Sequence, residues 1–251
     1  MNFQEYNKIL LTVFKWILIC LLTGFLSGSA SAFFLVSLEF VTQFRMHHTW
    51  IIWLLPIGGL LIGFLYHYYG ESVVKGNNLL LEEYENPKKV IPLKMATLVL
   101  LGTLVTHLFG GSAGREGTAV QMGGAIADQF TKFFQLDNSE RKTLIILGIS
   151  AGFASAFGTP LAGAIFALEV LFFSKINFKS IVLSFFVAYI AYFTVEFWQV
   201  QHTHYNIPIV PKIDFTTLFY TILIGILSGL AALLFSRSTH FWGSFFSKNI
   251  N

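Results

Sequence analysis

The sequence has few charged residues and almost no cysteine. Aspartate, glutamate, lysine and arginine make up 12% of its 251 residues, whereas 55% are hydrophobic; soluble domains carry about 25% charged residues. This composition excludes a soluble globular domain and indicates an integral membrane protein. The single cysteine, Cys20, excludes an internal disulfide framework. The formal net charge of +3 is too small to predict nucleic acid as a partner.

Apolar runs of membrane-spanning length alternate with short polar breaks. They predict spans at about residues 9–41, 50–69, 94–109, 144–157, 162–173, 178–197 and 218–235. Several runs are too short for a full crossing, and short or glycine-interrupted helices are typical of transporter binding sites. We therefore expect an all-α, multi-pass protein of tilted and broken helices in the cell (inner) membrane. Lys8 and Lys15 favour a cytoplasmic N-terminus.

Two adjacent charges, Arg115 and Glu116, interrupt the apolar pattern inside the glycine-rich stretch Gly110–Gly117. Charges at membrane depth are costly and usually line a water-filled or ion-binding cavity. Irregular backbone at that depth must be buried in protein or line such a cavity. A helix N-terminus offers unpaired N–H groups and partial positive charge to an anion. We therefore predict a break before a helix that begins near Gly117, with an anion site for which the Glu116 carboxylate competes.

Two further segments combine glycine or proline with small polar residues before a helix. In Lys75–Asn78, the asparagines Asn77 and Asn78 either cap a helix or lie at the same anion site. Lys75 is either a solvated loop residue or attracts an anion. We expect this loop and the helix start after the glycine-rich stretch to face one cavity. In Gly148–Gly163, small residues at every third or fourth position predict close helix packing.

Two segments resemble the CLC family of chloride channels and transporters. The first reads Gly114-Arg115-Glu116-Gly117 followed by Val120-Gln121. The second comprises Ala151-Gly152 through Phe157, then Pro160-Leu161-Ala162-Gly163 and Phe166. The Gly-Asn-Asn sequence at residues 76–78 and the Gly-Arg-Glu-Gly-Thr sequence at residues 114–118 are more similar to the fluoride/proton antiporter branch of that family.

The resemblance implies a CLC-type helical bundle in which Glu116 is the gating glutamate. It also implies an anion-binding set, which consists of Arg115, Gly117, Thr118, Lys75, Gly76, Asn77 and Asn78. Two positions depart from the family pattern. Lys75 stands near the place of a serine that touches the anion, and Val170 stands where chloride/proton exchangers carry an internal glutamate. The second departure weakens the standard chloride-exchanger proton path and favours the fluoride branch.

The resemblance covers only part of a family subunit, which contains two inverted repeats. We expect residues 1–251 to form a single transmembrane domain, with the first repeat at about residues 9–200 and the start of the second at about residues 215–251. The filter helix of the second repeat has no counterpart in this sequence, so we expect the chain to be truncated. We expect a complete subunit to form a homodimer.

The leading functional prediction is halide transport, with chloride or fluoride as the substrate, by a channel or a proton-coupled antiporter. Ionised Glu116 would occupy the anion site, and protonated Glu116 would admit halide. Two alternatives are a non-transporting structural remnant and an intramembrane enzyme, for which Ser112 near His107 would supply nucleophile and base. We expect no enzymatic activity, no cofactor and no metal site. The expected partners are halide anions, protons and membrane lipid.

Overall fold

The computed structural model describes residues 3–170, 177–200, 202, 208 and 210–249, and every regular element within those ranges is a helix. It divides into two compact units, Met1–His202 and Thr203–Asn251. Four helical stretches are long and apolar enough to cross a membrane, namely Gln4–His47, Thr49–Tyr69, Phe178–Phe197 and Phe215–Phe246. The prediction of an all-α membrane protein is therefore confirmed.

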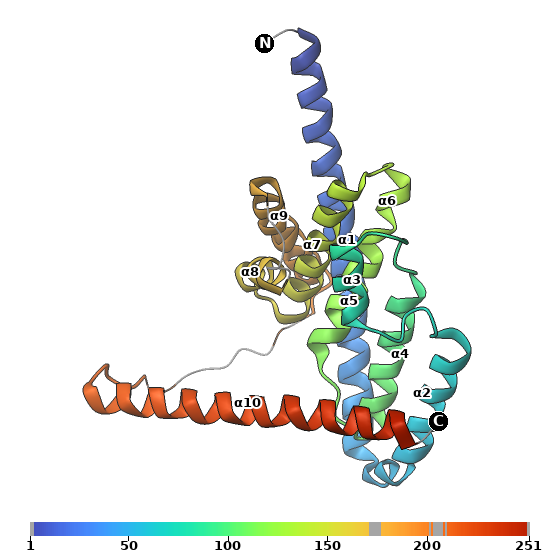
Figure 1. The fold of residues 1–251 in the computed structure, drawn as a ribbon, viewed down its shortest axis with the longest axis vertical. Coiled ribbons are helices and arrows are strands. Elements are labelled where there is room, and N and C mark those ends of the chain that lie inside the picture. Colours follow the sequence, from blue (N-terminus) through green and yellow to red (C-terminus); the bar gives the residue numbers. More distant parts are fainter. Residues whose placement is uncertain (1–2, 171–176, 201, 203–207, 209, 250–251) are drawn as a thin grey trace. The chain divides into compact units, whose positions relative to one another are not determined.

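The first unit packs around its longest helix. In chain order it contains α1 (Phe3–His47), the 3-10 helix η1 (Thr49–Leu54), α2 (Leu55–Tyr69), α3 (Asn77–Glu85), α4 (Lys94–Leu108), α5 (Arg115–Asp128), α6 (Phe130–Phe133), α7 (Asn138–Phe157), α8 (Pro160–Val170) and α9 (Phe178–Phe197). Figure 1 shows α1 running the length of this unit, with α2 and α4 on one side and α8 and α9 on the other. Helix α5 packs against α1, α4 and α7 near the centre.

The helices differ greatly in length, as the broken-helix prediction requires. At about 1.5 Å per residue, the 45 residues of α1 extend roughly 68 Å, against a hydrocarbon core of about 30 Å. Helix α1 must therefore tilt or extend beyond the bilayer. In contrast, α4 and α8 have only 15 and 11 residues and are too short to cross alone. The second unit contains α10 (Phe215–Asn249), in which no described side chain is buried.

Local sequence sets several helix boundaries. Helix α7 begins with a capping box, in which the Asp137 carboxylate accepts from the Glu140 backbone N–H and the Glu140 side chain accepts from the Asp137 backbone N–H. It ends at Gly158, whose φ of 67° is the left-handed conformation that favours glycine. Helix α9 begins at Asn177, whose side chain accepts from the Ser180 N–H. These caps hold both ends of α7 and the start of α9 in place.

Helices α5 and α7 approach so closely that only glycine fits between them. A Cβ atom on Gly152 would overlap the Ala119 carbonyl oxygen, and one on Gly123 would overlap the Gly148 carbonyl oxygen. The sequence prediction of close packing at Gly148–Gly163 is confirmed at these positions. The contact joins backbone to backbone, so neither helix can yield by a side-chain rotation. It therefore determines where the N-terminus of α5 lies.

Candidate functional site

The predicted break before the charged pair is present. Helix α4 ends at Leu108, Gly110 has a φ of 79°, and α5 begins at Arg115. The prediction that the helix begins near Gly117 was wrong by two residues. Gly114 has extended backbone and acts as the N-cap, so the helix starts at the next residue. Glu116 is consequently in the first turn of α5, where the helix dipole favours a negative charge.

Side chains from α4 hold the loop that leads into α5. The Nε2 atom of His107 lies 2.9 Å from the Ala113 carbonyl oxygen, and because that oxygen only accepts, Nε2 carries the hydrogen. The hydroxyls of Thr103 and Thr118 lie 2.6 Å apart, and both residues are buried. Thr118 Oγ1 also lies 3.3 Å from the carbonyl oxygen of the N-cap Gly114. These contacts connect both the loop before α5 and the first turn of α5 to α4.

The second predicted segment also forms a helix start. Gly76 has a φ of 56° and is the N-cap residue of α3, while Asn77 and Asn78 are its first two residues. Neither asparagine is therefore the N-cap residue. Lys75 Nζ lies 2.6 Å from a carboxylate oxygen of Glu82 in an ion pair whose two side chains are more than half exposed. The Lys75 ammonium thus has a partner on α3, outside the cavity described next.

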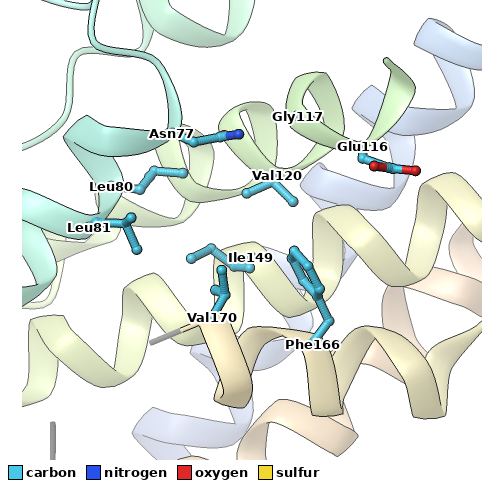
Figure 2. A pocket seen from close by; sticks show the side chains of 9 residues that line it. All are labelled: Asn77, Leu80, Leu81, Glu116, Gly117, Val120, Ile149, Phe166 and Val170. Atoms are coloured by element: carbon cyan, nitrogen blue, oxygen red, sulfur yellow. The ribbon is translucent and has the colours of Figure 1, made fainter. Parts of the chain in front are cut away.

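A cavity of about 160 Å³ brings the two helix starts together. Its lining consists of Asn77, Leu80, Leu81, Glu116, Gly117, Val120, Ile149, Phe166 and Val170 (Figure 2). The cavity wall is therefore mostly apolar, with one carboxylate and one amide side chain. Of the predicted anion-binding residues, Asn77 and Gly117 line it together with the predicted gate. The other five, Lys75, Gly76, Asn78, Arg115 and Thr118, are not among its lining residues.

Two glycines allow α3 and α5 to approach each other beside this cavity. A Cβ atom on Gly117 would lie 3.2 Å from Asn77 Nδ2, which is closer than most such contacts allow. A Cβ atom on Gly76 would lie 3.4 Å from Gln121 Nε2. Gln121 was not among the predicted site residues, although it follows Gly117 by one helical turn and so shares its face of α5. Glycine at these positions therefore leaves room for the Asn77 amide against α5 and for the Gln121 amide against the start of α3.

Metal and catalytic alternatives can be compared with the same geometry. Among the described residues, no group of three or more histidine, cysteine, aspartate or glutamate side chains is placed to hold a metal ion. The His107 side chain, considered as a base for Ser112, contacts the Ala113 carbonyl. Residues 110–114 and 148–152 both read Gly-x-Ser-x-Gly. A nucleophile elbow with that sequence needs a strand-to-helix turn, whereas Ser112 follows α4 and Ser150 lies inside α7.

Comparisons with known proteins agree with the fold and with the family that the sequence resembles. A family model described as "Voltage gated chloride channel" matches residues 58–251. A "Chloride/fluoride channel protein" of Pseudomonas syringae pv. tomato is 47% identical over 246 residues, which are 98% of this chain and 54% of that protein. The chain spans about half the length of the curated relatives it matches.

Two solved structures show the same architecture. The crystal structure of a CLC-type fluoride/proton antiporter matches with a TM-score of 0.80 and 33% identity, covering 92% of this chain and 56% of the other. The X-ray structure of a slow cyanobacterial Cl⁻/H⁺ antiporter matches with a TM-score of 0.74 and 22% identity, covering 88% of this chain and 56% of the other. The second match is informative for the fold alone.

Proposed function

Because the chain belongs to the voltage-gated chloride channel family, we propose that it forms one side of a halide path through a membrane, gated by Glu116. The observation that carries this proposal is the cavity lined by both Glu116, in the first turn of α5, and Asn77, in the first turn of α3. The first N–H groups of a helix have no acceptor within it and carry partial positive charge. An anion at this place is therefore attracted by the start of α5. In α3, the N–H groups of Asn78 and Leu79 already donate to the carbonyls of Lys75 and Gly76, so α3 contributes the Asn77 side chain.

The gate works by competition between two anions. When ionised, the Glu116 carboxylate occupies the place that a halide would take at the start of α5. When protonated, it loses its attraction to the helix dipole, leaves that place and carries its proton away. Halide then enters, with the Asn77 amide as one hydrogen-bond donor. Because one carboxylate exchanges with halide and also binds a proton, the arrangement supports coupled movement of the two ions.

The substrates, the membrane and the assembly form part of the same proposal. Fluoride and chloride are the substrates, because the relatives described above are named for fluoride and chloride, and protons are the coupled ion.

Lys15 of α1 pairs with Glu140 at the start of α7, and Lys179 at the start of α9 lies over the Trp16 ring. These cations gather at one end of the unit, which the positive-inside rule assigns to the cytoplasm. We place the protein in the cell (inner) membrane, with a complete subunit forming a homodimer and without enzymatic activity.

Halide transport by the protein reconstituted in liposomes tests this function directly. We expect the protein translated from the complete reading frame that contains these residues to release fluoride or chloride from vesicles, as followed with ion-selective electrodes. We expect the 251-residue chain alone to remain at the level of empty vesicles. A halide must exchange its hydration shell for donors on several sides, whereas this cavity has one amide side chain and a mostly apolar wall. Efflux through the 251-residue chain that is lost on Glu116→Gln would show that this half is sufficient.

A further inference from the structure

Three charged residues that the cavity does not use are buried together at the other end of α3. Glu83, Asp128 and Arg141 have exposed fractions of 8%, 0% and 4%. Arg141 donates from Nε to Asp128 Oδ1 at 2.8 Å and from Nη2 to Asp128 Oδ2 at 2.7 Å. Its Nη1 atom donates to Glu83 Oε2 at 2.9 Å. One guanidinium therefore joins the end of α5, the start of α7 and the body of α3, and these three residues are named the Arg141 cluster below.

The Arg141 cluster also holds the chain between α3 and α4. Glu83 Oε2 accepts from the backbone N–H groups of Lys88 and Lys89, at 2.8 Å and 3.1 Å. Asp128 Oδ2 accepts from the Ile91 N–H at 2.7 Å. The two carboxylates exceed the single guanidinium by one negative charge, and these backbone donors provide the remaining hydrogen bonds that buried carboxylates need. The cluster is therefore satisfied through its contacts with several elements.

Apart from the bonds at Glu83, α3 is held largely by apolar packing, with Leu80 and Tyr84 buried in the core. The helix has nine residues, and its N-cap residue, Gly76, has no side chain that could cap the first N–H groups. Leu80 is buried against Gly124, where there is no space for a Cβ atom. Apolar contact of this kind is non-directional, and the exposed pair of Lys75 and Glu82 contributes little. Beside this packing and the exposed contact of Lys142 Nζ with the Glu85 carbonyl oxygen, the buried bonds at Glu83 add a directional restraint on rotation and sliding of α3.

Asn77 is the residue that this restraint affects at the cavity. It precedes Glu83 by six residues, which is about 9 Å along a helix axis. Its amide lies within van der Waals range of the Gly117 position in α5. A short helix behaves as a rigid rod at this length, so a shift at Glu83 reaches Asn77. We propose that the Arg141 cluster positions α3 so that Asn77 is held at the Glu116 cavity, and that it thereby sets the halide affinity of that cavity.

This inference rests on the proposed function for its transport readout, and it makes Glu83 and Arg141 positioning residues. The variant that removes the restraint is Glu83→Ala. We choose it because Asp128 remains as the counter-ion of Arg141, so that no buried charge is left unpaired. Glu83→Gln keeps an acceptor of the same shape and should restore most of the function. Glu85→Ala is the matched control, since Glu85 is on the same helix and is exposed.

A double-mutant cycle separates positioning from a general loss of stability. In the protein from the complete reading frame, we expect Asn77→Ala to raise the half-saturating fluoride concentration about tenfold, as for the loss of one donor to a charged group. We expect Glu83→Ala to raise it about fivefold in the parent and less than about twofold in the Asn77→Ala background, because residues that act as a unit are not additive. Glu83→Gln and Glu85→Ala should stay near the parent value. The same fivefold loss in both backgrounds would overturn the inference.

Hydrogen–deuterium exchange gives a second readout that does not depend on transport. We expect faster exchange at the backbone amides of residues 79–82 in Glu83→Ala, and parent rates in Glu85→Ala. If the parent protein moves no halide, the proposed function fails, and exchange alone decides whether Glu83 restrains α3. If Glu83→Ala changes neither fluoride affinity nor exchange in an active protein, the positioning inference fails while the proposed function stands.

Discussion

Replacing Glu116 by glutamine is expected to abolish proton coupling while the halide path remains. Glutamine has nearly the shape of glutamate but never carries the negative charge that competes with halide at the start of α5, and it does not release a proton. In liposomes carrying the protein from the complete reading frame, halide-driven proton uptake should fall to the background of empty vesicles. Halide efflux should persist and become insensitive to a change from neutral to mildly acid pH.

The matched control for this experiment is Glu82→Gln. Glu82 is also a glutamate, on α3, but it pairs with Lys75 and does not line the cavity. The Glu82→Gln variant should therefore keep both the coupling and the pH dependence of the parent. Unchanged pH dependence in Glu116→Gln, or its loss in Glu82→Gln, would contradict the assignment of the gate.

Adding one methyl group at Gly152 is expected to prevent correct folding. In Gly152→Ala the new Cβ atom would overlap the carbonyl oxygen of Ala119 on α5. Relief requires the two helices to separate, which opens the α5–α7 contact along its length. We expect a loss of at least about 3 kcal/mol, the upper part of the range for overpacked cores. Thermal unfolding and size-exclusion chromatography in detergent should show early unfolding or aggregation.

The same substitution in an open helical position is the control. A Cβ atom on Gly102 of α4 would have its nearest neighbours in Tyr66 and Ile62, at 3.8 Å and 3.9 Å, which is ordinary contact. Because alanine favours helix over glycine by about 1 kcal/mol, Gly102→Ala should be neutral or slightly stabilising. Equal stability of the two variants would show that α5 and α7 do not need the close approach.

The site was only partly predictable from sequence, because some of its features depend on local backbone conformation and others on contacts between distant segments. The break before α5 and the turn before α3 depend on local glycine conformation, and both were located within two residues. Lys75 could not be assigned from sequence, since its ion pair with Glu82 depends on how α3 begins. Gln121 was missed because nothing in the local pattern indicates that it faces α3.

The Arg141 cluster escaped prediction for a related reason. Arg141 and Glu83 are separated by 58 residues. The residues that flank each of them in the sequence are polar, as in a solvated loop or helix end. Charged residues near predicted polar breaks are ordinarily exposed. Only the packing of α3 against α5 and α7 buries them together, and only then does a buried charge require a partner.

The sequence by itself determined the membrane class, the helical breaks and the identity of the gating candidate. The membrane class and the breaks follow from composition, hydropathy or glycine conformation within a few neighbouring residues, whereas the gating role of Glu116 is what the resemblance to the CLC motif implies. The sequence also predicted that the segment with Asn77 would face one cavity with the start of α5, but the tertiary structure alone decided that Asn77 lines it, that Lys75 lies outside it, and that Arg141 restrains α3. These outcomes depend on distances between segments far apart in the chain, and those distances rest on tertiary contacts such as the Arg141 cluster and the backbone contact of α5 with α7, where even one methyl group has no space.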